Sequence, residues 1–242
     1  MNNWNEFNES GYSTAVQAEN EITLKRYVAG VMRKVYGKMT LGLLVTAITS
    51  FLLLSTPAAM SLLFSSTATI WILFAIELGI VIYLSARIDK LSAGMATTLF
   101  YFYSALNGVA LTPIFLAYTG VSIATTFAIT AGTFGAMTIF GYVTRQDLSK
   151  FGSYLFMALF GLIACMLVNL FLKNSMFDML ISGAGVLIFV GLTAWDTQAI
   201  KRMCAQADPS DLGKVATMGA LSLYLDFINL FLHLLRFFGS RN

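Results

Sequence analysis

The stretch MGALSLYLDFINLFLHLLRFF at residues 218–238 decides the fold. As a helix it is long and apolar enough to cross the hydrocarbon core of a bilayer, which needs about 20 residues. Its polar residues recur every three or four positions and so form one stripe along one helical face: Ser222, Asp226, Asn229, His233 and Arg236. Because polar groups are costly in hydrocarbon, the stripe must face protein or water. The stretch is therefore a candidate core helix of a bundle that moves something across a membrane.

The composition is that of an integral membrane protein. Hydrophobic residues make up 57% of the 242 residues and charged residues only 11%, with a mean hydropathy of +0.75. Soluble domains carry a charged fraction of about 25%. The basic residues are few and lie scattered between apolar runs, which excludes a nucleic-acid-binding protein.

The two cysteines and the N-terminus exclude three further features. Cys165 lies in an apolar run and Cys204 in a charged segment, so the two thiols are expected at different depths. We therefore expect no disulfide, and two separated thiols make no metal site. The start, MNNWNEFNESGYST, has no basic segment followed by an apolar core and is not a cleaved signal peptide. We expect no bound cofactor.

Long uncharged stretches predict an all-α integral membrane protein with a seven-transmembrane-helix bundle. No charged residue lies between Lys38 and Glu77 or between Lys90 and Arg145, which leaves room for several apolar helices. Turn-forming residues divide these stretches, as at 118–120. The predicted spans are 39–55, 69–86, 94–117, 121–143, 152–172, 179–199 and 216–238.

Two different segments precede the first span. Residues 1–24 are rich in Asn, Glu and Ser and predict a flexible polar tail. In 25–38, basic residues alternate with apolar ones, which predicts an amphipathic helix lying at the membrane surface. Residues 25–239 are expected to form a single transmembrane domain.

The distribution of basic residues predicts the orientation of the chain. With the N-terminus in the cytoplasm, twelve of the 15 Lys and Arg residues fall in cytoplasmic segments. Such a bias follows the positive-inside rule. It favours an odd number of spans with the C-terminus outside, in the cytoplasmic (inner) membrane if the protein is bacterial. The main alternative has six spans and a re-entrant last segment.

Three acids fall within the apolar spans: Glu77, Asp196 and Asp226. An acid within a membrane span is a candidate functional residue, although a structural hydrogen bond between helices is about equally common for a single one. Three of them favour function, because each adds its own cost of burial.

Asp196 and Asp226 are expected to face each other. They lie on the last two spans, which a short loop makes antiparallel neighbours. Two facing carboxyl groups in a medium of low dielectric constant resist double ionisation, so that such a pair shares a proton and can titrate near neutral pH. When ionised, the pair is also a sparse, weak oxygen site for a hard cation such as Ca²⁺.

Other polar residues are weaker candidates. Arg87 can pair with either aspartate as a latch, or it simply anchors its span by the positive-inside rule. Ser222, Asn229, His233 and Asn107 are possible pore-lining residues. For Asn229 a hydrogen bond between helices is the more common case, and for His233 a satisfied interfacial position, although a histidine can titrate at physiological pH.

No enzyme motif is present. The sequence contains no GxSxG, HExxH, paired CxxC or phosphate-binding loop. We expect the protein not to be an enzyme, although an intramembrane aspartyl protease would also use two acids on neighbouring spans.

The C-terminal stretch ALSLYLDFINLFLHLLRFFG at 220–239 closely resembles the signature of the Bax inhibitor-1 family, also called the transmembrane Bax inhibitor motif family. Weaker matches are WDTQAIK at 195–201, NGVALTPIF at 107–115, and Glu77 with Arg87 at the end of the same span. The likeness extends over roughly residues 25–239. The family includes bacterial members, and this chain resembles those.

The resemblance implies a fold and a function. It implies a seven-helix bundle with the last helix at its centre, and a pH-sensitive Ca²⁺ leak whose sensor is the aspartate pair of the last two helices. Asp196 and Asp226 occupy those positions, and Glu77 and Arg87 match the acid of the second helix and its basic partner. The resemblance says nothing of the residues before 25.

Four functions remain open. A pH-sensitive calcium leak channel is the leading hypothesis, with Ca²⁺ and protons as its ions. An interaction protein that modulates a membrane-bound protease or another partner is the second, and a proton-coupled transporter the third. Intramembrane proteolysis comes last.

Overall fold

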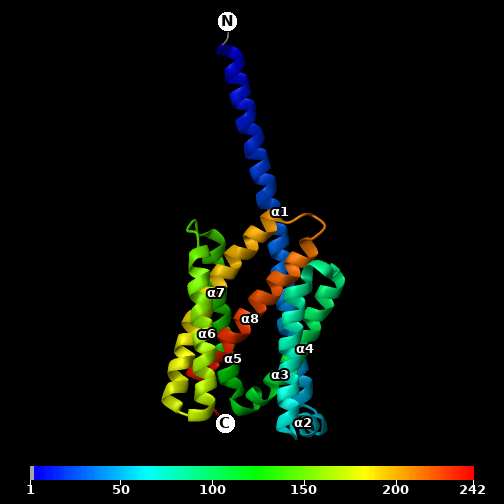
Figure 1. Cartoon of the computed structure of the whole chain (residues 1–242), viewed down its shortest axis with the longest axis vertical. Helices are drawn as coiled ribbons and strands as arrows, with labels where there is room; N and C mark the ends of the chain where they lie inside the picture. Colours follow the sequence, from blue (N-terminus) through cyan, green and yellow to red (C-terminus); the bar gives the residue numbers. More distant parts are fainter. Residues whose placement is uncertain (1–2) are drawn as a thin grey trace.

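A computed structural model describes the backbone of residues 3–242, and the side chains of Glu19 and of residues 21–242. Within these residues the chain is helical, and seven of the helices are long and apolar enough to cross a membrane (Figure 1). The all-α membrane bundle predicted from the sequence is therefore confirmed. The helices are α1 (Asn3–Leu54), α2 (Pro57–Phe64), α3 (Thr67–Arg87), the short 3₁₀ helix η1 (Ile88–Lys90), α4 (Ala93–Ala117), α5 (Gly120–Val143), α6 (Ser149–Leu172), α7 (Ser175–Gln206) and α8 (Leu212–Phe238).

The predicted spans lie within the seven long helices, except that the first one extends a single residue, Ser55, past the end of α1, and there are two further differences at the N-terminal side. The segment 57–64, which we expected to be part of a connection, forms the short helix α2, with Pro57 in its first turn. The predicted surface helix at 25–38 is wrong as a separate element, because α1 runs without a break from Asn3 to Leu54. Its apolar residues are buried in the bundle, as Val31 and Val35 show, instead of lying on the membrane.

Polar side chains at the helix starts explain the sharp turns between spans. Ser92, Thr119 and Asn174 each accept a hydrogen bond from a backbone N–H in the first turn of α4, α5 and α7. The predicted turn at 118–120 therefore lies where the structure has it. At the end of α6, Lys173 adopts a left-handed conformation with φ of 51° and closes the helix.

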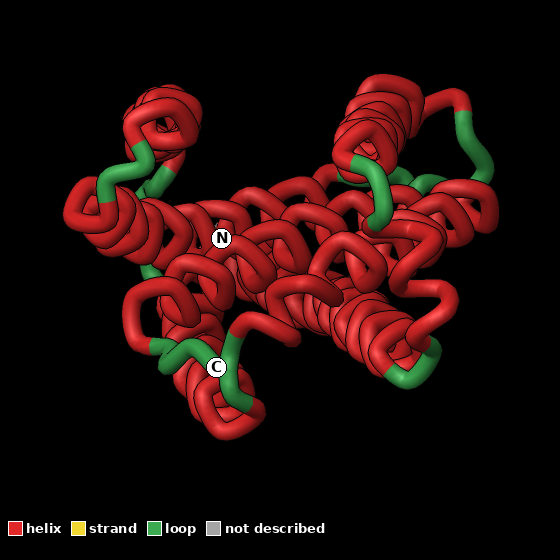
Figure 2. Tube along the Cα trace, turned by 90° about the horizontal axis from the view of Figure 1, so that it is seen from below, coloured by secondary structure: helices red, strands yellow, loops and turns green. Residues whose placement is uncertain are grey.

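Helix α8 is the central helix of the bundle. It packs most extensively against α7 and also contacts α1, α5 and α4. In Figure 1 it crosses the bundle obliquely, and in the view from below in Figure 2 other helices are seen end-on around the oblique ones. The buried share of its most apolar window is 67%, the largest of the seven spans.

The start of α1 and the C-terminus lie toward opposite ends of the bundle (Figure 1). That arrangement fits an odd number of spans. Helix α8 is a continuous helix of 27 residues that is long enough to cross a membrane, which disfavours the re-entrant alternative.

Close backbone contacts hold two pairs of spans together. Gly108 of α4 lies against α1, where a Cβ atom would be 2.6 Å from the carbonyl oxygen of Thr46. Gly141 of α5 lies even closer to the backbone of Ala194 in α7. Small residues let membrane helices approach in this way, which gains dispersion contacts that a larger residue would prevent.

Candidate functional site

A cavity of about 550 Å³ lies between α3, α4, α6, α7 and α8. Its apolar wall comes largely from α3 and α6, and its polar residues come mainly from α7 and α8. Among the described residues, no Lys or Arg borders it. The polar and titratable residues that line it are Glu77, Tyr103, Asp196, Ser222, Asp226, Asn229 and His233.

The helical spacing of α8 brings four of these residues to the same cavity. Ser222, Asp226, Asn229 and His233 follow one another along one face, as their intervals predict. Asp226 and His233 are only 4% and 5% exposed. Arg236, the fifth member of the stripe, lies beyond the cavity and forms an ion pair of 3.4 Å with Asp178.

The two aspartates of α7 and α8 are neighbours. The antiparallel packing of the two helices places the half-buried Asp196 next to the Asp226 carboxyl group. Oδ2 of Asp226 is buried and accepts no hydrogen bond from another described residue. A buried carboxyl oxygen without a donor fits a group that holds a proton or faces a passing ion, and the role of the pair as a pH sensor stays a prediction.

Glu77 brings a third carboxyl group to the cavity from α3. Its Oε1 atom is also buried without a hydrogen-bond partner among the described residues. Tyr103 of α4 borders the same cavity, and its hydroxyl group accepts a hydrogen bond of 3.3 Å from Asn107. Asn107 is therefore one residue removed from the cavity, and it does not line it as we expected of a pore residue.

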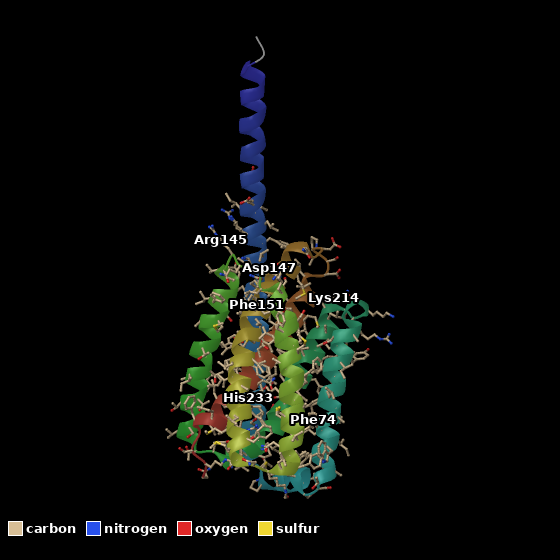
Figure 3. The ribbon with its side chains drawn as sticks, turned by 60° about the vertical axis from the view of Figure 1, so that its left-hand side comes forward. Phe74, Arg145, Asp147, Phe151, Lys214 and His233 are labelled. Carbon is tan, nitrogen blue, oxygen red and sulfur yellow. The ribbon has the colours of Figure 1, made fainter. Side chains whose placement is uncertain are left out.

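His233 lies in the half of the bundle away from Arg145 and Lys214 (Figure 3), which is the depth its position in the sequence predicts. Its ring stacks on Phe189, with ring centroids 5.7 Å apart and planes 25° apart. Gly185 of α7 leaves room for it, since a Cβ atom there would lie 2.5 Å from the imidazole. Nδ1 is buried and has no partner among the described residues.

Arg87 is not brought to the aspartates. It lies exposed at the end of α3, does not border the cavity, and enters none of the ion pairs of the described residues. The latch between Arg87 and either aspartate is not formed in this structure, and its part in gating stays a prediction.

The cavity is not a closed metal cage. Within the described residues, no group of three or more His, Cys, Asp or Glu residues is placed to hold a metal ion. Because Ca²⁺ takes six to eight oxygen ligands, an ion beside the aspartate pair would keep most of its coordination from water.

Two hydrogen-bonded clusters on the other side of α8 were not found from the sequence. The hydroxyl groups of Tyr224 and Thr46 are 2.6 Å apart, and Thr46 also donates to the carbonyl oxygen of Ser104 at 2.8 Å. Nearer the end of the bundle where Arg145 and Lys214 lie, which we call the basic end, Lys38 donates to Thr97 and Thr217, both at 2.6 Å. Only the position of Lys38, at the edge of a long uncharged stretch, was a signal in the sequence.

Comparisons with known proteins agree with the architecture. Residues 28–242 match the family model described as "Inhibitor of apoptosis-promoting Bax1". The chain is 52% identical to the inner membrane protein YbhL of Escherichia coli over 87% of this chain and 91% of that protein. It is 44% identical to an uncharacterized protein of Borreliella burgdorferi over 93% and 97% of the two chains, and 36% identical to an uncharacterized membrane protein of Streptococcus pyogenes over 94% and 98%.

Seven apolar helices and an inner-membrane relative make this a multi-pass integral membrane protein. Because the family model covers all seven spans and the central polar helix, the chain belongs to the Bax inhibitor-1 family.

Proposed function

We propose that the protein is a pH-sensitive calcium leak channel whose gate is the pair Asp196 and Asp226. The observation that carries the proposal is that one cavity, of about 550 Å³, contains three carboxyl groups and has no Lys or Arg among its described lining residues. Uncompensated acids inside a membrane protein commonly mark an ion pathway.

The pair supplies the pH dependence. Two adjacent carboxyl groups away from bulk water share a proton, and the second ionisation is delayed by the first. In the protonated state the pair is held together by a hydrogen bond between α7 and α8. In the doubly ionised state the two groups repel each other and attract a divalent cation. The other titratable groups that face the pair's cavity are Glu77 of α3, Tyr103 of α4 and His233 of α8.

Ca²⁺ entry into dye-loaded proteoliposomes tests this proposal. Flux is measured at about pH 6 and about pH 8, either side of the neutral range in which a shared-proton pair titrates. The wild type is expected to conduct differently at the two values, and Asp196→Asn and Asp226→Asn to lose the difference. Asp208→Asn, an exposed acid away from the cavity, makes the same chemical change and is expected to behave as the wild type.

Two results contradict the proposal. One is a wild-type protein that is no leakier than empty liposomes at either pH. The other is a pH dependence that both cavity variants retain. A Ca²⁺ flux that a pH gradient drives uphill would instead identify a proton-coupled transporter, because a leak only follows the Ca²⁺ gradient.

One observation favours a second function, the modulation of a membrane protease or another partner. The backbone helix of α1 begins at Asn3 and projects beyond the bundle (Figure 1), while the family match begins only at residue 28. Deletion of residues 1–20 separates the two functions. A partner that co-purifies with the full chain and is lost on deletion, with Ca²⁺ flux unchanged, would support this second function for the projecting segment.

A further inference from the structure

A second cavity, of about 660 Å³, lies at the basic end of the bundle between α1, α5 and α7. Arg145 and Asp147, which border it, stand at this end in Figure 3. It shares no residue with the acid cavity and carries the opposite charge. We call it the basic groove, and its charged lining residues are Lys25, Arg145, Asp147, Lys201 and Arg202.

The basic groove continues into an apolar one. A cavity of about 780 Å³ lies between α1 and α5, and the two cavities share Tyr142 and Val143. We call this second part the apolar groove; the one charged residue among its described lining residues is the exposed Arg33, whose charge has the same sign as that of the basic groove. Its wall is open to the bilayer, because the side chains of Ile139 and Val143 are 65% and 68% exposed. A charged recess that leads into an exposed apolar channel has the shape and polarity of an amphiphile.

We propose that the two grooves together bind one anionic phospholipid, with its phosphate in the basic groove and an acyl chain in the apolar groove. Basic pockets between membrane helices bind anionic headgroups, since Lys and Arg attract the phosphate and Arg can hold it with two hydrogen bonds. Four basic residues against one acid give the groove a net charge that complements such a headgroup.

Contacts within the protein fix two of the four cations in place. Lys201 donates to the carbonyl oxygen of Tyr142 at 2.8 Å and lies 4.8 Å above the centre of that ring. Arg202 forms an ion pair of 2.8 Å with Asp147 and also bonds Gln198 and Ser149. Both positive groups are thereby oriented before a ligand arrives, which lowers the entropic cost of binding.

The other two cations are available to the ligand. Arg145 is exposed and enters none of the ion pairs of the described residues. Lys25 has only an exposed contact of 3.4 Å with Glu21, and exposed pairs of this kind contribute little. Lys25, on α1, and Arg145, in the loop after α5, can therefore extend toward a phosphate and bind it.

The headgroup part of the proposal is tested by native mass spectrometry of the purified full chain in detergent, with an anionic or a zwitterionic phospholipid of the same acyl chains. The anionic lipid is expected to bind more tightly. The double variant Lys25→Gln/Arg145→Gln is expected to weaken its binding about 25-fold, at about fivefold for each charge. The matched double variant Lys34→Gln/Lys90→Gln removes two exposed charges that border neither groove, and is expected to leave binding within about twofold, as screened exposed charges do.

The acyl-chain part needs a different pair of variants. Gly37 borders the apolar groove and Gly30 does not, and a Cβ atom at either position would meet nothing within 4 Å. Gly37→Trp is expected to fill the groove and abolish retention of the lipid, while Gly30→Trp retains it. Both variants introduce the same residue into the same helix. A difference in lipid retention between them is therefore due to the filled groove and not to a general effect on folding.

Several results overturn the proposal. Equal retention of anionic and zwitterionic lipid excludes headgroup recognition, and an equal effect of the two double variants excludes the basic groove. Full displacement of the lipid by excess inorganic phosphate identifies free phosphate as the ligand. A dimer that Gly37→Trp dissociates without any effect on lipid retention identifies a second copy of the chain as the occupant.

Discussion

The most buried and the least buried spans reverse the order expected of a soluble protein. Mean hydropathy and buried share both refer to the most apolar 18-residue stretch of each span. In α6 this stretch has the highest mean hydropathy of the seven, 2.5, and only 6% of it is buried. Helix α8 has a mean hydropathy of 1.6, and 67% of its window is buried. Helix α3 resembles α6, with a hydropathy of 2.1 and 6% buried.

The reversal follows from the solvent. In a bilayer the lipid tails are as apolar as leucine, so apolar surface gains little from burial, whereas polar groups gain partners only inside the protein. The single aspartate, the histidine and the tyrosine of α8 (Asp226, His233 and Tyr224) therefore lie buried at the centre of the bundle. Most residues of α3 and α6 are exposed on the outside of the bundle, and apolar side chains of both helices close the cavity from that side.

The largest effect is expected when a glycine is enlarged between the packed inner helices α4 and α1, and the matched changes are made in the outer helices α3 and α6. Gly108→Leu places a side chain against the backbone of Thr46, where even a Cβ atom lies at 2.6 Å. Overpacking of this kind costs about 3 kcal/mol or more, because the backbone of α1 cannot yield as a side chain can. We expect little folded protein, measured as the monodisperse fraction in size-exclusion chromatography. Gly79→Leu in α3 and Gly161→Leu in α6 meet nothing within 4 Å and are expected to fold normally; failure of these two would contradict the comparison.

A smaller effect is expected from the hydroxyl pair between α1 and α8. Tyr224→Phe removes the partner of Thr46, with both side chains buried. The expected cost is about 1 kcal/mol, as for a typical buried hydrogen bond. It is measured by reversible unfolding in detergent. The control is Thr56→Val, at an exposed position between α1 and α2 where the hydroxyl group donates to the nearby carbonyl oxygen of Leu52, and it is expected to change stability little.

In a double-mutant cycle, Thr46→Val added to Tyr224→Phe is expected to cost less than the sum of the two single changes. Strict additivity of the two changes would show that the hydroxyl groups do not interact.

The smallest effect concerns a charge outside both regions. Hydrogen bonds from the backbone and side chain of Ser149, together with Arg202, lower the pKa of Asp147 to about 2 from 3.8. Since the folded pKa lies below the unfolded one, its stabilising contribution is complete above about pH 4 and is lost as the pH falls toward 2. The difference in melting temperature between the wild type and Asp147→Asn is therefore expected to be small and constant between about pH 6 and about pH 8. A difference that changes within that neutral window would assign part of the pH response to the loop before α6 and not to the cavity.

The same variant bears on the basic groove. Asp147→Asn releases Arg202 and removes the only acid that borders the groove among the described residues. We expect anionic lipid to bind a few times more tightly, by up to about fivefold for one unit of charge near the surface. Unchanged or weaker binding would show that Asp147 is needed to hold Arg202 in place, and that its negative charge does not oppose the ligand.

The sequence predicted the features that depend on periodicity within one helix. The intervals in α8 identified the residues that reach the cavity, and the uncharged stretches identified the spans. Contacts between helices far apart in the chain were not predictable, because a period shows which face is polar but not which helix it meets. Thr46 with Tyr224, and Lys38 with Thr217, are such contacts. The surface helix at 25–38 was wrong for the same reason, since an amphipathic face fits a bundle as well as a membrane surface.

The central place of α8 sets a condition on how the protein is made. A ribosome completes α8 only after the other six spans have entered the membrane, so these six must assemble around an axis that is still vacant. During that interval Asp196 of α7 lacks the neighbour it has in the finished bundle. A nascent chain that stops before Leu212 has most of its length but lacks every contact of α8, and we expect the membrane quality-control proteases to remove it.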